Sequence, residues 1–191
     1  MRSAVPEGFE NHCLRCLMRR EVCLCESILV VETKVHFVIV QHTVERLRTS
    51  NTGRLAALAL PNCELLEYGG PIPFDPSKLE GPDTWLLYPS PSGRAGAAPR
   101  RLVVLDGSWH QSRKMYARLK LLHTMPCLSL APPDPTLVRL RRPPNPGAMS
   151  TLEAVAAAVA HLEGEAKARP LFALHDAHAS RILALKGYPK Q

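Results

Sequence analysis

Residues 101–111, RLVVLDGSWHQ, join a short apolar run directly to the polar start of a helix. The run Arg101–Leu105 is short and rich in β-branched side chains, which is typical of a buried strand. It ends at Asp106, and Ser108 follows as a helix N-cap with Gln111 three residues later, the spacing of a capping box. We therefore predict a strand that passes straight into a helix, with a carboxylate at the junction.

The same alternation of strands and helices extends in both directions along the chain. Before residue 101, β-rich apolar runs and one helical pattern predict strands at 28–31, 35–40, 64–68 and 84–88 and a helix over 54–60. After residue 111, we predict a strand at 127–130, a helix over 151–163 that opens with a second capping box (Ser150 and Glu153), and a final helix over about 172–185. This order indicates an α/β fold with a mostly parallel sheet flanked by helices.

Length and composition agree with one globular domain that carries a small appendage. The chain has 191 residues, of which 46% are hydrophobic and 21% charged, so a disordered tail and a fibrous repeat are excluded. No apolar run approaches the roughly 20 residues that span a bilayer, and the first residues lack the apolar core of a signal peptide. We expect a soluble, cytoplasmic protein with no membrane partner, which is a monomer or a weak dimer.

The basic residues are concentrated in one part of the chain. The formal net charge is +7, and the window 95–145 alone holds nine basic residues and two acids. A concentrated basic region favours a polyanionic partner such as nucleic acid. The alternative is a solvated surface whose charge keeps the protein soluble.

Four of the six cysteines lie close together near the N-terminus, at Cys13, Cys16, Cys23 and Cys25. Without an export signal the thiols should stay reduced, and four thiolates form the ligand set of a closed, structural zinc site. His12 is a candidate to replace one of them. The alternative is a set of free buried or redox-active thiols. We predict a zinc knuckle over residues 1–27, followed by the main domain over 28–191.

Three segments of the predicted fold follow strands or precede helices, where α/β proteins bind their ligands. They are 87–89, 106–109 and 147–149, and none has the glycine spacing that binds NAD or a nucleoside triphosphate. The second segment holds the most chemistry. Asp106 can accept a hydrogen bond or a proton, Gly107 permits close approach of a ligand, and Trp109 can stack on a base. An aspartate at the end of a strand is also common as a plain turn residue.

These residues resemble the Asp-x-Thr-Trp signature of the DTW-domain family, with Ser108 in the place of the usual threonine. The resemblance covers nearly the whole chain through ordered motifs: the two cysteine pairs, Gln41-His42 with Glu45, Asn51-Thr52-Gly53-Arg54, Leu87-Tyr88-Pro89, Asp106-Gly107-Ser108-Trp109, Leu140-Arg141-Arg142, and Ser150-Thr151-Leu152-Glu153-Ala154. A literal Asp83-Thr84-Trp85 opens a strand instead of ending one, and we interpret it as a coincidence.

The resemblance implies a SPOUT-like fold with a C-terminal trefoil knot that holds S-adenosylmethionine. It also implies a tRNA-uridine aminocarboxypropyltransferase, which moves the 3-amino-3-carboxypropyl group of that donor to N3 of a uridine in tRNA and releases 5′-methylthioadenosine. Modification of rRNA, a SPOUT-like RNA methyltransferase and a non-catalytic zinc-containing RNA-binding module are the alternatives.

The resemblance and the chemistry of the residues together assign roles to individual positions. Asp106 is the candidate general base, with His42 and His110 as weaker candidates. The predicted donor-binding residues are Tyr88, Pro89, Leu105, Gly107, Ser108, Trp109, Ser150, Thr151, Asn51 and Thr52. The predicted RNA-binding residues are Arg113, Lys114, Arg139, Arg141 and Arg142. We expect His175 and His178 to lie on a surface helix without a ligand role.

Overall fold

The computed structural model describes residues 7–89, 98–134, 136–140 and 147–185. Its centre is a five-stranded sheet in the order β2-β1-β4-β3-β5, and every neighbouring pair is parallel. The strands are β1 (His36–His42), β2 (Cys63–Tyr68), β3 (Thr84–Leu87), β4 (Arg101–Asp106) and β5 (Cys127–Leu128). The helices are α1 (Gly53–Ala59), α2 (Trp109–Arg118), α3 (Thr151–Glu163) and α4 (Glu165–Leu185). The predicted α/β class and mostly parallel sheet are confirmed.

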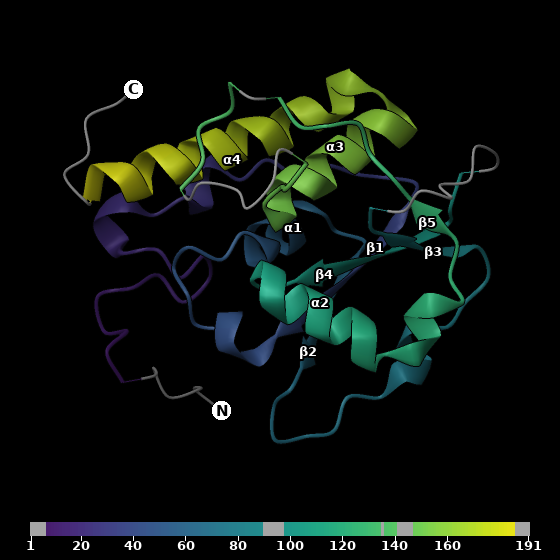
Figure 1. The fold of residues 1–191 in the computed structure, drawn as a ribbon. Coiled ribbons are helices and arrows are strands. Elements are labelled where there is room, and N and C mark those ends of the chain that lie inside the picture. The colour runs from purple at the N-terminus through teal and green to yellow at the C-terminus, as the bar shows by residue number, and fades with distance from the viewer. Residues whose placement is uncertain (1–6, 90–97, 135, 141–146, 186–191) are drawn as a thin grey trace.

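Both faces of the sheet are covered, as a parallel sheet requires. Phe37 and Ile39 of β1 pack in the larger core with α1, α3 and α4. Val38 and Val40, which alternate with them, pack in a second core with Met115 of α2. The ribbon in Figure 1 shows the same division, with α3 and α4 on one side of the strands and α2 on the other. Because successive side chains of β1 point to opposite faces of the sheet, the strand contributes to two separate cores.

Three expectations about local structure are wrong. Residues 28–31 form no strand, and Leu29 and Val30 are exposed. The last helix begins at Glu165 instead of near 172, because Gly164 ends α3 at a positive φ of 99° and Pro170 is accommodated within α4. His175 and His178 are buried rather than on the surface, and His178 Nε2 lies 3.1 Å from the Thr49 carbonyl.

The cysteine-rich segment packs directly on the main domain. Cys16, Met18 and Leu24 are buried in the same core as α1, α3 and α4. Arg181 of α4 donates to the carbonyls of Val22 and Cys23 and to Ser27 Oγ. Among the described helices, none combines the length and the apolar character needed to cross a lipid bilayer.

Candidate active site

The candidate site lies between the carboxyl ends of β1 and β4, the two neighbouring strands at which the strand order switches sides. From β1 the chain continues to β2 on one side, whereas β3 and β5 lie on the other side, beyond β4. At such a switch point the loops after two neighbouring parallel strands separate, which leaves a crevice at their carboxyl ends. Gln41 of β1 and Asp106 of β4 are register partners there. The sheet itself therefore brings these two polar side chains together.

Asp106 is the centre of a buried polar network. It is 2% exposed, and its carboxylate accepts three side-chain hydrogen bonds. Oδ2 accepts from Gln41 Nε2 at 3.0 Å and from Asn51 Nδ2 at 2.7 Å. Oδ1 accepts from Thr151 Oγ1 at 2.6 Å. One carboxylate thus connects β4 to β1, to the loop before α1 and to the first residue of α3.

The start of α1 lies against the same carboxylate. A Cβ atom on Gly53 would come within 2.5 Å of Asp106 Cγ and Oδ2, so only glycine fits at this position. Asn51 Oδ1 accepts from Gln41 Nε2 and from the backbone N–H of Arg54. Thr52 Oγ1 accepts from the backbone N–H of Leu152 in α3 at 3.3 Å. The side chains of Asn51 and Thr52 are consequently engaged within the protein.

The predicted capping box at the start of α2 is confirmed. Ser108 Oγ accepts from the Gln111 backbone N–H at 3.3 Å, and Gln111 Oε1 accepts from the Ser108 N–H at 2.6 Å. Trp109, which is 39% exposed, is the first residue of α2 and lies three residues after Asp106 in the chain. Tyr88 follows β3, the strand next to β4, and its ring stacks on that of Tyr116 in α2 with the centroids 4.5 Å apart. Burial raises the pKa of the Tyr88 phenol.

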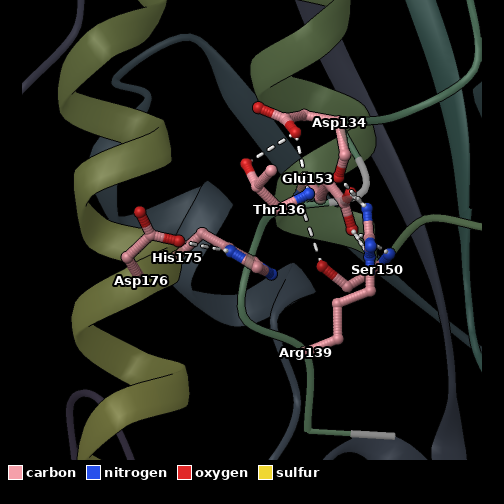
Figure 2. A network of polar contacts seen from close by, with 7 residues as sticks. All are labelled: Asp134, Thr136, Arg139, Ser150, Glu153, His175 and Asp176. Atoms are coloured by element: carbon pink, nitrogen blue, oxygen red, sulfur yellow. Dashed lines mark hydrogen bonds and ion pairs between the residues drawn. The ribbon is translucent and has the colours of Figure 1, made fainter. Parts of the chain in front are cut away.

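The start of α3 is held by a buried ion pair, which Figure 2 shows. Ser150 and Glu153 form the second predicted capping box. Arg139 Nη2 lies 2.6 Å from Glu153 Oε1 and also donates to the Asp134 carbonyl at 2.8 Å. The Arg139 side chain is 16% exposed and that of Glu153 is 1% exposed. Arg139 therefore fixes the first turn of α3.

The four N-terminal cysteines converge as predicted. The sulfur atoms of Cys13, Cys16, Cys23 and Cys25 all lie within 4.8 Å of one another. Burial opposes ionisation of Cys13, but hydrogen bonds from the backbone of Cys16 and Arg15 and from neighbouring thiols outweigh it and lower its pKa to about 6. Burial and the neighbouring thiols raise the pKa of Cys25. The cluster can hold a metal ion, because a cation would remove the repulsion between several thiolates.

Two surface hollows border the cysteine-rich segment and α3. One, of about 470 Å³, borders the cysteine-rich segment between Gly8 and Glu21. The other, of about 260 Å³, lies between the 130–137 loop and α3, where Glu153, Ala157 and His161 line it. Neither Thr151 nor Asp106 is among the residues that line this second hollow.

Comparison with known proteins identifies the family. A family model described as the DTW domain matches residues 10–183. The chain belongs to the DTW-domain family. It is 30% identical to a tRNA-uridine aminocarboxypropyltransferase 2 from Drosophila melanogaster, over 87% of this chain and 72% of that protein. It is 26% identical to the proteins of the same name from Mus musculus and Macaca fascicularis, over 92% and 88% of this chain and 67% and 64% of theirs. No solved structure gives a significant match.

The DTW domain gathers most of the predicted donor-binding residues at one edge of the sheet. Tyr88 and Pro89 follow β3, and the neighbouring strand β4 carries the signature. The residues at or beside the Asp106 network are Leu105, Gly107, Ser108, Asn51, Thr52, Ser150 and Thr151. Their roles toward a donor stay predictions.

The predicted RNA-binding residues divide into three groups. Arg113 and Lys114 are exposed on α2 of the DTW domain. Arg139 instead pairs with Glu153. Arg141 and Arg142 lie outside the described residues.

Three residues that help to build this site were absent from the predicted site residues. Gln41 is a polar residue at the end of an apolar strand, a position that carries a signal for function. Gly53 lies in the first turn of a helix, where glycine is unfavourable unless space demands it. Glu153 was identified as half of a capping box and as part of a family motif, and its burial was not visible in the sequence.

Proposed function

We propose that this DTW domain transfers the 3-amino-3-carboxypropyl group of S-adenosylmethionine to N3 of a uridine in tRNA and releases 5′-methylthioadenosine. The observation that carries the proposal is the similarity, over most of this chain, to proteins named for aminocarboxypropyl transfer to tRNA uridine. The geometry supports it, because the family signature lies at the switch point of a parallel sheet, where such folds bind nucleoside ligands.

The residues at this edge fit the donor chemically. S-adenosylmethionine supplies an electrophilic carbon next to a sulfonium sulfur when it is bound. Tyr88, Pro89 and Leu105, with the backbone of Gly107 and Ser108, would hold the adenosyl part. Ser150 and Thr151 would close the pocket from α3, and Asn51 and Thr52 would hold the loop that faces the amino-acid part. Trp109 would stack on the extruded uracil.

Asp106 would take the N3 proton of uridine as general base. Its three hydrogen bonds make it an anchor of the fold as well, so the two roles must be separated experimentally. Asp106→Asn keeps the size of the side chain. If Asp106 is the base, the turnover rate should fall about 10²–10⁴-fold while donor affinity is kept. Equal losses of donor binding and of rate would make Asp106 an anchor only.

The tRNA backbone would lie along α2, where Arg113 and Lys114 are exposed, with Arg141 and Arg142 as further candidates. A structural Zn²⁺ would be held by Cys13, Cys16, Cys23 and Cys25, since four thiolates leave no open coordination position for catalysis. The proposal also includes a division of the chain into a zinc knuckle over 1–27 and a main domain over 28–191, with a SPOUT-like trefoil knot. It further includes a cytoplasmic location and a monomeric or weakly dimeric state.

Nucleoside mass spectrometry of tRNA incubated with the protein and S-adenosylmethionine tests the reaction. We expect 3-(3-amino-3-carboxypropyl)uridine and an equal amount of 5′-methylthioadenosine. S-adenosylhomocysteine as the by-product would instead establish a methyltransferase. If calorimetry detects tRNA binding but no donor binding, the chain is a non-catalytic RNA-binding module.

A further inference from the structure

Arg54 differs from Arg46 and Arg48, its basic neighbours along the chain, in having no ion-pair partner among the residues that the structure describes. Arg46 lies 3.8 Å from Glu67, and Arg48 lies 3.1 Å from Glu45. Among the described residues, no carboxylate lies within ion-pair distance of Arg54. Its Nη2 donates to the backbone carbonyl of Arg46, at 2.6 Å. The charge of Arg54 is therefore not neutralised within this part of the chain.

The Arg54 side chain is also incompletely hydrogen-bonded. Its Nε is shielded from solvent and has no hydrogen-bond partner among the described residues. A buried donor without a partner is unfavourable, and native structures tolerate one mainly where a ligand or function requires it. Burial lowers the pKa of the Arg54 guanidinium and repulsion from Arg46 lowers it further, whereas Asp106 raises it. The guanidinium thus lies within the electrostatic field of the candidate site.

The backbone of Arg54 connects it to the Asp106 network. Its backbone N–H binds Asn51 Oδ1, and Asn51 binds Asp106, so the start of α1 and the network are one rigid unit. Asn51 and Thr52 already hydrogen-bond inside the protein, which leaves Arg54 as the group of this segment suited to an anion. A guanidinium matches the geometry of a carboxylate through paired N–H donors.

We propose that Arg54 binds the carboxylate of the donor's aminocarboxypropyl chain and thereby selects this chain, rather than the methyl group, for transfer. The inference rests on the proposed function. A sulfonium sulfur carries three electrophilic carbons, so the group transferred depends on which carbon is held in line with the uridine nitrogen. An ion pair at the far end of the chain fixes that orientation and makes no contact with the methyl group.

The test compares three ligands that share the adenosyl part. S-adenosylmethionine has the carboxylate, its decarboxylated analogue keeps the ammonium but lacks the carboxylate, and 5′-methylthioadenosine lacks the whole chain. Calorimetry is performed with wild type, Arg54→Gln, Arg54→Lys and the control Arg100→Gln. Arg100 is an exposed arginine at the opposite, amino-terminal end of β4. Thermal unfolding of each variant verifies that it is folded.

We expect Arg54→Gln to weaken S-adenosylmethionine binding by about 10- to 100-fold, the effect of losing a charge-assisted hydrogen bond. Binding of 5′-methylthioadenosine and of the decarboxylated analogue should change less than about threefold. Arg54→Lys should recover part of the loss, and Arg100→Gln should show none. In single turnovers with saturating donor, Arg54→Gln should raise the proportion of methylated to aminocarboxypropylated uridine.

Three results would overturn the assignment of Arg54. Equal weakening of all three ligands would make it a structural residue of α1. Unchanged donor binding with weaker tRNA binding and a smaller salt dependence would make its partner an RNA phosphate. Unchanged binding of every ligand would leave it no role in recognition. A wild-type protein that binds no S-adenosylmethionine would refute the proposed function itself, which is a separate outcome.

Discussion

The ion pair between Arg139 and Glu153 allows a quantitative prediction, because its two partners are buried to different extents. Glu153 is 1% exposed and Arg139 is 16% exposed. Arg139→Met would leave the buried Glu153 carboxylate with one hydrogen-bond donor among the described residues, the backbone N–H of Ser150 at 3.2 Å. Removing one partner of a buried pair costs about 3–5 kcal/mol. For a chain of this length that corresponds to a fall in Tm of roughly 6–20 °C.

The opposite substitution should be milder. Glu153→Gln keeps an acceptor for Ser150, and Arg139 is exposed enough to recover contact with water, so we expect a loss of about 1–2 kcal/mol. The double variant should be more stable than Arg139→Met alone, since it no longer buries an unpaired charge. Chemical denaturation of the four proteins, with the coupling energy taken from the complete cycle, measures these differences.

The same variants separate a positioning role from the RNA-binding role that the sequence suggested for Arg139. Because Thr151 is the residue after the Ser150 cap and donates to Asp106, a loosened first turn of α3 should weaken donor binding. The slope of tRNA affinity against salt should not change. The reasoning would be refuted if Arg139→Met kept its stability and donor affinity but reduced that slope by about 1, the signature of one lost phosphate contact.

Four further results are expected. Gly53→Ala should destabilise the fold by about 1–3 kcal/mol and weaken donor binding, because its Cβ would lie 2.5 Å from the Asp106 carboxylate; circular dichroism melts and calorimetry measure both. Removal of bound metal by a chelator should lower Tm by about 6–12 °C in a single transition, since the cysteine-rich segment shares its core with the main domain. Burial lowers the pKa of His178 below its ordinary value of 6.5, so as the pH falls the unfolded chain is protonated at this residue before the folded chain is. The stability of the fold should therefore decrease as the pH drops below 6.5. Urea titrations at several pH values should show a weaker dependence for His178→Gln. Arg113→Gln and Lys114→Gln should each weaken tRNA binding and reduce its salt slope by about 1, without any change in donor affinity.

Local sequence patterns were sufficient wherever local physics decides the structure. The two capping boxes, at Ser108 and Ser150, lie where their spacing predicts them. The run 101–105 is a buried strand because its β-branched side chains are covered on both faces. The cysteine spacing predicted a cluster because its members are at most 12 residues apart, so a short loop brings them together.

The errors arose where a distant partner decides the structure. The ion pair of Arg139 with Glu153 was likewise not evident from the position of Arg139 in a basic, proline-rich region, and its predicted contact with RNA stays a prediction. His178 looked like a surface residue because of its polarity, yet a carbonyl 129 residues away satisfies it in the interior. Leu29 and Val30 have the composition of a strand but no neighbouring strand with which to pair. Composition does not reveal such partners.

The Asp106 network shows why the residues of the signature are insufficient to specify the site. Its partners Gln41, Asn51 and Thr151 are separated from Asp106 by 65, 55 and 45 residues, so none of them can reach the carboxylate before the sheet, α1 and α3 have packed. The hydrogen bonds of Asp106 therefore require the packing of several segments that are distant in sequence, and Asp106 lies at the centre of the candidate site. A donor that binds at this edge of the sheet must then stabilise the state in which β1, β4, the start of α1 and the start of α3 are packed together, relative to any partly opened state. It follows that donor binding and global stability are linked, and that substitutions of Gln41, Asn51 or Thr151, which each remove a hydrogen bond to Asp106, should lower both together.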